Sequence, residues 1–504
     1  MISRLRTGAP ARCSAPIPSI GLAKSTSCQI KRPKRKNLRQ LKKMKRCINE
    51  LPLQRSTCLH QPSACCQNQS APEKMWSAKI REFYAKYVHI NEGTMGIDAK
   101  ICTIFKHMKI GILKEGKVPV DKRVALTPAH AAALKSNFDC DVVVQPSAIR
   151  AIADDEYVEA GIALQQDLSD CDVLFGVKEV PIDQLIPNKT YFFFSHTYKQ
   201  QPYNAKLLKA CVDRNIRLID YELLKKNGNR VVAFGRFAGL VGAYNGLRGW
   251  GEKYGQFALK PAHECRDMQD MFAQLKGVDW PSDMRILLTG KGRVASGAVE
   301  TLQAAGIPQI APVEIENHEG SFWSQLDVEH YYRTSDGSPF DRKELFADPS
   351  GFESNFMQYA PYAKLYIAGH YYDSRAPFIF TRADAKRLDF AITYVSDISC
   401  DIDGPVASTL RPSTIAEPFY GYLAREEKEV AHDDPEAIGV MAVDNLPCEL
   451  PRDASLSFGS DLIEHVIPAL FDGDKEHILF RATECSDGAL TTDFNYLQAY
   501  IDKA

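Results

Sequence analysis

Two neighbouring stretches decide the fold: Asp172-Val-Leu-Phe-Gly-Val-Lys178-Glu179 and Thr190-Tyr-Phe-Phe-Phe-Ser-His196-Thr-Tyr-Lys199-Gln-Gln201. Each opens with a short apolar run that is rich in Val, Leu or Phe. Such runs are typical of strands that are buried on both faces of a parallel sheet. We therefore expect an α/β fold in which these two strands lie in one sheet.

Titratable side chains follow both apolar runs. Lys178 and Glu179 come after the first run, and His196 and Lys199 come after the second. Ligands bind at the carboxyl ends of the strands in open α/β sheets, so a Lys and a His should reach one cleft. A lysine there loses hydration and shifts toward neutrality, a nearby Glu opposes this, and a histidine titrates near neutral pH. The alternative is a solvated loop lysine and a histidine that is only hydrogen-bonded.

Size and composition limit the class of protein. The chain has 504 residues, 45% of them apolar and 25% charged, which fits a soluble protein of two or three domains. A net charge of -1 gives no general attraction to nucleic acid or membrane. The 14 cysteines include no CxxC pair and are expected to be reduced thiols of an intracellular protein. We expect a cytoplasmic protein without nucleic-acid or membrane partners.

Residues 1–107 differ from the rest of the chain. Residues 1–50 contain 14 Lys or Arg against the single acid Glu50. An organelle transit peptide, which would direct the chain to a mitochondrion or plastid, is one interpretation. A polyanion-binding patch at residues 31–36 is another. The third, which we favour, is a disordered or wrongly annotated leader, with translation starting at Met95 or Met108.

Strands and helices alternate after residue 107. We expect strands at 109–114, 141–145 and 217–221, and helices that begin at Thr127-Pro128 and at Pro202. This order predicts a mainly parallel sheet with right-handed crossovers. The fold expected overall has two Rossmann-like, doubly wound parallel-sheet domains with a cleft between them. The proposed divisions are a leader (1–107), a catalytic or substrate domain (108–240), linking helices (241–282), a dinucleotide-binding domain (283–403), a return to the catalytic domain (404–472) and a tail (473–504).

A dinucleotide motif opens the second sheet. A strand at 284–289 is followed by Gly290-Lys-Gly292-Arg293-Val294-Ala295 and then by a helix. Gly290 permits a tight turn, and Gly292 lets a pyrophosphate approach the backbone. The helix N-terminus supplies free N–H groups, and Arg293 adds a charge.

Two acids are candidates for binding the rest of the nucleotide. Glu314 follows the expected second strand at 310–313 and should take the ribose hydroxyls, with Glu316 as the rival. An acid at this place favours NAD over NADP. Residues 318–362 look like an insertion. Asp397 ends a strand and should contact the ribose or the nicotinamide, and we expect no metal site.

Six stretches together resemble saccharopine dehydrogenase of the lysine-forming type, over residues 108–472. The wider relatives are alanine dehydrogenase and the nucleotide-binding subunit of transhydrogenase. The stretches are 122–128, 176–181, 195–199, 234–239, 289–294 and 443–455. The resemblance implies that saccharopine passes a hydride to NAD, and that water then splits the imine into lysine and 2-oxoglutarate.

The resemblance also implies roles for individual residues. Lys178 acts as a base toward the substrate amine, and His196 handles protons during imine hydrolysis. Arg123 holds a substrate carboxylate. Glu179 and Lys199 are implied to tune Lys178 and His196. Gln201 and Phe234 are implied to line the substrate pocket. The implied cofactor contacts are Arg230, Arg293, Val294 and Asp397.

Alternatives remain at this point. The chain could be another amino- or imino-acid dehydrogenase related to alanine dehydrogenase, or a nucleotide sensor without catalysis. The leader, the segment 318–362 and the tail have no counterpart in the fungal enzymes. The expected partners are saccharopine, or lysine with 2-oxoglutarate, and the expected assembly is a monomer or small homo-oligomer.

Overall fold

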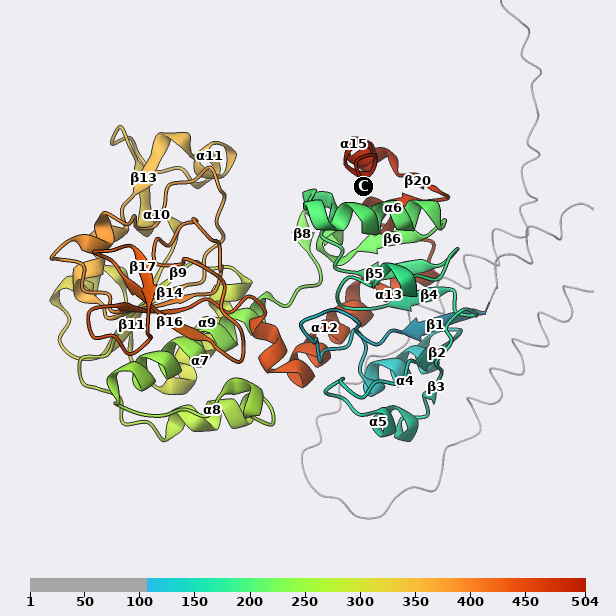
Figure 1. Cartoon of the computed structure of the whole chain (residues 1–504), viewed down its shortest axis with the longest axis horizontal. Coiled ribbons are helices and arrows are strands. Elements are labelled where there is room, and N and C mark those ends of the chain that lie inside the picture. Colours follow the sequence, from blue (N-terminus) through green and yellow to red (C-terminus); the bar gives the residue numbers. More distant parts are fainter. Residues whose placement is uncertain (1–106) are drawn as a thin grey trace, which may run out of the picture. The chain divides into compact units, whose positions relative to one another are not determined.

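The computed structural model describes residues 107–504, and the predictions about the leader lie outside the described residues. The described part contains two eight-stranded, mostly parallel sheets with helices between their strands (Figure 1). The predicted α/β class is therefore confirmed. The division into domains stays a prediction, except where strand pairing contradicts it below.

The first sheet has the order β20-β19-β6-β5-β4-β1-β2-β3. Its parallel strands are β1 (Met108–Ile112), β2 (Cys140–Val144), β3 (Ala163–Leu164), β4 (Val173–Phe175), β5 (Thr190–Phe193) and β6 (Arg217–Asp220). The two stretches quoted first form β4 and β5, which pair directly, with Phe175 opposite Phe192. The rings of these two residues stack with centroids 4.6 Å apart. Tyr191 and Phe193 pack on the opposite face, so both faces are buried as expected.

Three helices connect the parallel strands: α4 (Pro128–Asn137), α5 (Asp154–Glu159) and α6 (Ala205–Asp213). Thr127 stands at the N-cap of α4 with Pro128 in the first turn, as predicted. The polar residues that follow β4 and β5 therefore leave the sheet at the same edge.

The C-terminal residues complete the first sheet, which the sequence did not predict. The strand β19 (Thr483–Ser486) pairs antiparallel with β6, and β20 (Ala489–Leu490) pairs with β19. The helix α15 (Gln498–Ile501) contacts α6, as Figure 1 shows near the C terminus. Residues 473–504 are therefore part of the first sheet's core and not a separate tail.

The second sheet has the order β10-β11-β9-β14-β15-β18-β16-β17. Its strands are β9 (Arg285–Thr289), β10 (Gln309–Ile310), β11 (Phe322–Leu326), β14 (Leu365–Ala368), β15 (Tyr394–Asp397), β16 (Phe419–Leu423), β17 (Lys428–Val430) and β18 (Ile438–Met441).

The pairing in this sheet corrects two predictions made from the sequence. The segment 318–362 contains β11, which pairs directly with β9, and so is not only an insertion. Residues 419–441 extend this sheet and do not return to the first one.

A long helix, α7 (Gly235–Tyr254), crosses α9 (Arg293–Ala305) at very short range. A Cβ added at Gly239 would lie 1.8 Å from the carbonyl oxygen of Val294. One added at Gly297 would lie 1.9 Å from the carbonyl oxygen of Arg236. Gly239 and Gly297 therefore allow the backbones of α7 and α9 to pack directly against each other.

The remaining elements are short or lie outside the two sheets. They are β7 (Lys225–Lys226), β8 (Asn229–Arg230), α8 (Met268–Lys276), α10 (Val328–Tyr331), β12 (Tyr332–Thr334), α11 (Arg342–Ala347), β13 (Phe352–Ser354), α12 (Pro451–His465), α13 (Ile467–Phe471) and α14 (Ile478–Ala482). Within residues 107–504, no helix combines the length and apolar character that a bilayer span requires.

Candidate active site

The backbone at the end of β4 is held by a buried carboxylate from the neighbouring strand. Glu115, just after β1, accepts hydrogen bonds from the N–H of Val177 at 2.7 Å and of Lys178 at 2.8 Å. Burial, and then the charge of Asp121, raises the pKa of Glu115 to about 7 in spite of these bonds. The two bonds fix the point from which the Lys178 side chain departs.

Lys178 stands in surroundings that favour its neutral form. Burial lowers its pKa first, and the charges of Arg123 and Lys117 lower it further. Glu179 and Asp121 act in the opposite direction but do not outweigh these effects. The direction is the one expected of a lysine that serves as a base.

Arg123 is buried and already paired. Its Nε donates to Asp121 Oδ1 at 3.0 Å, and its Nη2 donates to Asp121 Oδ2 at 2.6 Å and to Asn445 Oδ1 at 3.2 Å. The guanidinium lies 4.2 Å from the ring centroid of Phe234. Among residues 107–504, no hydrogen bond from Nη1 is found, so Nη1 is the donor left for a substrate carboxylate.

His196 belongs to a cluster centred on Glu222. Its Nδ1 lies 3.2 Å from Glu222 Oε2, and the same carboxylate binds Lys199 Nζ at 2.7 Å and Arg230 Nη2 at 3.1 Å. Burial alone would raise the pKa of Glu222, but these partners outweigh it and hold the pKa well below its usual value. An ionised Glu222 orients the imidazole and balances the two cations.

Glu222 was missed by the sequence prediction, and Arg230 was predicted to lie at the cofactor. The signal for Glu222 was present, because it follows the strand at 217–220 in the way that Glu179 follows β4. Glu222 thus comes from the third consecutive strand end at the same edge of the sheet. Arg230 reaches the cluster from the β7–β8 hairpin.

Glu179 interacts electrostatically with both Lys178 and His196. Its Oε2 accepts from Lys117 Nζ at 2.7 Å. Burial raises its pKa, but Lys117 first and then the charge of His196 lower it by more. The structure therefore places the lysine and the histidine on adjacent strand ends with an ionised carboxylate beside both.

The loop after β9 has the form that a dinucleotide requires. Gly290 has φ 98°, and a Cβ added there would lie 2.8 Å from the Gly369 carbonyl oxygen. Gly292 is the N-cap of α9, and no atom lies within 4 Å of a Cβ added there. A cavity of about 950 Å³ opens over this loop, and its lining includes Gly290, Lys291, Gly292 and Asp327. These residues fit a pyrophosphate at the helix N-terminus.

The acid beside this loop is Asp327 and not Glu314. Asp327 follows β11, which pairs with β9, and its Oδ2 lies 3.1 Å from Lys291 Nζ and 2.7 Å from Arg342 Nη2. Glu314 lies in a 3₁₀ turn and accepts the Ala311 N–H at 2.7 Å. The strand order assumed for Glu314 was wrong, because β10 is the edge strand and β11 is the neighbour of β9. The run Phe322–Leu326 followed by Asp327 was the better signal.

Asp397 ends β15, and its carboxylate is hydrogen-bonded to residues that follow it in the chain. Its carboxylate accepts from Thr409 Oγ1 at 2.6 Å and from Ser399 Oγ at 2.7 Å. Burial raises its pKa. Both carboxylate oxygens are thus hydrogen-bonded within the turn, and the cofactor contact of Asp397 stays a prediction.

The other predicted residues hold the site's surroundings. The backbone carbonyl oxygen of Gln201 accepts a hydrogen bond from the Tyr500 hydroxyl at 2.5 Å. The ring of Phe234 stacks on that of Phe458, with ring centroids 4.4 Å apart. Arg293 donates to the Arg230 carbonyl oxygen, which links the dinucleotide loop to the β7–β8 hairpin. Val294 is partly buried and packs against α7.

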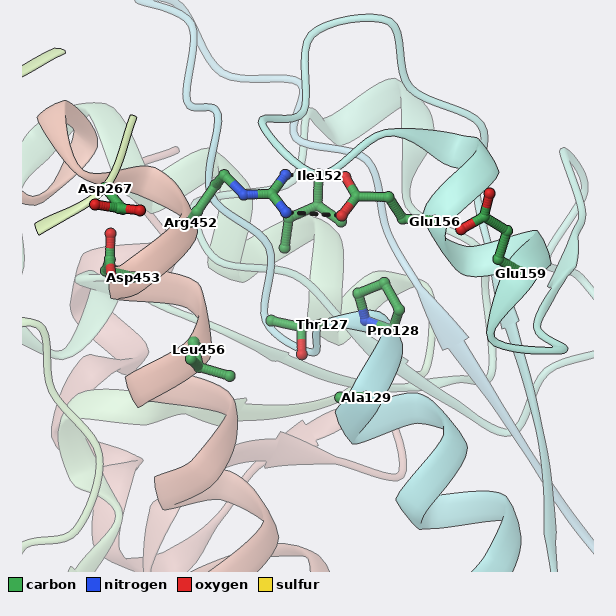
Figure 2. Close-up of a pocket in the computed structure, with 10 residues that line it drawn as sticks. All are labelled: Thr127, Pro128, Ala129, Ile152, Glu156, Glu159, Asp267, Arg452, Asp453 and Leu456. Atoms are coloured by element: carbon green, nitrogen blue, oxygen red, sulfur yellow. Dashed lines mark hydrogen bonds and ion pairs between the residues drawn. The ribbon is translucent and has the colours of Figure 1, made fainter. Parts of the chain in front are cut away.

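A second cavity, of about 420 Å³, contains none of the predicted site residues (Figure 2). Its lining includes four carboxylates and Arg452, which is paired with Glu156 at 2.7 Å. Within residues 107–504, no group of three or more His, Cys, Asp or Glu side chains could hold a metal ion.

Comparison with known proteins agrees with this arrangement. The model of the alanine dehydrogenase/PNT N-terminal domain matches residues 111–241. Alpha-aminoadipic semialdehyde synthase, mitochondrial, of Mus musculus is 29% identical over 430 residues, which are 75% of this chain and 46% of that protein. The chain spans less than half the length of this synthase.

Two further relatives complete the comparison. Saccharopine dehydrogenase (NAD(+), L-lysine-forming) of Neurospora crassa is 26% identical over 392 residues, covering 74% of this chain and 94% of that protein. The solved structure of an L-alanine dehydrogenase matches with a TM-score of 0.55 and 17% identity, covering 79% of this chain and 99% of that one. The resemblance predicted from the sequence is confirmed by these relatives, and the last supports the fold.

Proposed function

We propose that this chain is an NAD-dependent oxidoreductase that converts saccharopine to lysine and 2-oxoglutarate, or runs the reverse reaction. The observation that carries the proposal is the pair Lys178 and His196 on adjacent strand ends, with Arg123 beside the lysine. The names of the Neurospora crassa and Mus musculus relatives support lysine metabolism as its setting.

Each residue then has one task. NAD, held at Gly290 and Gly292, would accept a hydride from the substrate carbon. Lys178 in its neutral form takes the proton of the substrate's secondary amine, so the nitrogen lone pair can form the imine. Arg123 holds a carboxylate through Nη1.

Hydrolysis of the imine falls to His196. Its Nδ1 faces Glu222, so its Nε2 is the atom free to take a proton from attacking water and return it to the departing amine. Glu222 stabilises the protonated imidazole in between, as the acid partner of a catalytic histidine does. Lys199 and Arg230 keep this carboxylate ionised by their charges.

The alternative is an amino-acid dehydrogenase whose substrate is alanine. The family model over residues 111–241 and the fold of the L-alanine dehydrogenase favour it. The deciding experiment follows NAD reduction by the full chain with saccharopine and, separately, with alanine. We expect reduction with saccharopine only. Reduction with alanine alone would select the alternative, and reduction with neither would reject both.

A further inference from the structure

Beneath the His196 loop lies a network of buried side chains that the proposed reaction does not use. Asp220, at the end of β6, and Glu484, in β19, are both fully buried, as are Ser195 and Thr197. Ser195 Oγ lies 2.5 Å from Asp220 Oδ2, 3.0 Å from Glu484 Oε1 and 2.6 Å from Thr197 Oγ1. Thr197 Oγ1 lies 2.6 Å from Glu484 Oε2.

The number of protons in this network limits the charge it can hold. Four close oxygen–oxygen contacts join the two hydroxyls and the two carboxyls, and the hydroxyls supply only one proton each. If both carboxyls were ionised, two contacts would lack a proton inside a buried site, which is costly. A third proton, on a carboxyl, halves this deficit.

The third proton belongs on Glu484. Asp220 already accepts backbone N–H groups from Ser195, His196 and Glu222, at 2.9, 3.1 and 2.6 Å, and is suited to stay ionised. Glu484 has only the two hydroxyls as partners in the described residues. Burial, and then the charge of Asp220, raises the pKa of Glu484 to about 8. A protonated Glu484 donates to Ser195 Oγ and accepts from Thr197.

Two tyrosines of the C-terminal segment also form hydrogen bonds to this loop. Tyr496 donates to the Tyr198 carbonyl oxygen at 3.3 Å, and Tyr500 donates to the Gln201 carbonyl oxygen at 2.5 Å. His196 lies in this loop, and its backbone is in the left-handed region, with φ 56°. A non-glycine residue there is strained by about 1 kcal/mol or more and persists when its surroundings hold it. The contacts on both sides of His196 supply that hold.

We propose that Glu484 is a positioning residue for the proposed reaction: through Ser195 and Thr197 it fixes the loop 195–201 and so sets the place of the His196 ring. The inference rests on the proposed function for its kinetic consequences, and on geometry alone for its structural ones. Losing the Glu484 proton puts two like charges on either side of one hydroxyl. The other titratable groups that face Glu484 are Asp220, Glu222, Cys211, Cys485, Tyr496 and Tyr500.

Two substitutions separate the protonated acid from a mere packing residue. Glu484→Gln carries an amide that can donate to Ser195 and a carbonyl that can accept from Thr197, so it mimics the protonated acid at every pH. Glu484→Ala removes both contacts. Thr483→Val is the matched control, because Thr483 is buried in the same strand but its hydroxyl bonds to Leu479 and Arg217 and not to the loop.

The experiment measures amide hydrogen exchange of residues 195–201 and saccharopine turnover, each from pH 6 to pH 10. We expect Glu484→Ala to speed exchange of the loop and to lower kcat by about tenfold to a hundredfold, the scale of a misplaced catalytic group. Glu484→Gln should keep kcat within about twofold of the wild type. We expect the wild-type rate to fall above about pH 8, where Glu484 loses its proton, and we expect Glu484→Gln to lack this fall. Thr483→Val should match the wild type in the loop.

The inference is overturned if Glu484→Ala leaves loop exchange and kcat unchanged. It is also overturned if Glu484→Gln is as impaired as Glu484→Ala, because an ionised carboxylate would then be required. If the wild-type chain does not turn over saccharopine, the proposed function fails. The exchange measurements on the same variants still decide the role of Glu484.

Discussion

Replacing Lys117 by Met should raise the pKa of Lys178 and move the pH profile of the enzyme. Lys117 Nζ lies 2.7 Å from Glu179 Oε2 with its side chain 34% exposed, and its charge lowers the pKa of Lys178. The substitution removes that charge and frees Glu179, whose charge raises the pKa of Lys178. Both changes act in the same direction. Solvent screening reduces each of them, so we expect a modest rise in the pKa of Lys178 and a fall in kcat/KM at pH 7 of up to about tenfold.

The sign of the effect on rate follows from the role of a base. Only neutral Lys178 accepts a proton, so kcat/KM rises with pH below the pKa of Lys178, and above about pH 8 the loss of the Glu484 proton lowers the rate of the variant and of the wild type alike. A raised pKa leaves less of the neutral form at pH 7, so the rate there falls. Well above both pKa values the variant and the wild type should agree.

The assay is kcat/KM for saccharopine from pH 6 to pH 10, with Lys117→Arg as the matched control. The arginine keeps the positive charge and should leave the profile within about 0.3 units of the wild type. A tenfold fall that is equal at every pH would show that Lys117 binds substrate and does not tune Lys178. A profile that moves to lower pH would refute the electrostatic reasoning.

Three further predictions, which use five substitutions, test other parts of the account. Lys178→Met or His196→Ala should lower kcat by about a hundredfold or more, measured in the steady state, and an unchanged kcat in both would remove the site assignment. Asp327→Ala should weaken NAD binding by about tenfold in a fluorescence titration, the scale of a lost charged hydrogen bond, while Glu314→Ala should not. Gly239→Ala forces a Cβ to within 1.8 Å of the Val294 carbonyl oxygen and should lower the free energy of unfolding by about 3 kcal/mol or more in a urea titration. An unchanged unfolding midpoint would contradict the close crossing of α7 and α9.

The strands, their order along the chain and the dinucleotide loop could be predicted because each has a local signature. The runs before Lys178 and His196 are apolar in the pattern of buried strands, and Gly290 and Gly292 stand between strand and helix. Pairing between distant segments has no such signature. The choice of Asp327 over Glu314 depends on which strand lies beside β9, and Glu484 reaches the site only because β19 pairs with β6.

The sequence also could not show which charged side chains already have hydrogen-bond partners in the folded chain. Asp397 follows a strand as a ligand residue would, yet Thr409 and Ser399, both later in the chain, take its oxygens. Arg123 looks like a free anion binder, but Asp121, two residues before it, takes two of its donors. Residue type and strand position therefore predict which side chains gather at the site, and only the structure tells which of their atoms remain available.

The most direct test is a crystal structure of the chain with NADH and saccharopine bound. The account predicts the secondary amine of saccharopine within about 3.5 Å of Lys178 Nζ, and the pyrophosphate against Gly290 and Gly292. His196 should reach the same substrate carbon through one water. Saccharopine bound in the cavity lined by Arg452 and Glu156, or a pyrophosphate away from the loop after β9, would contradict it.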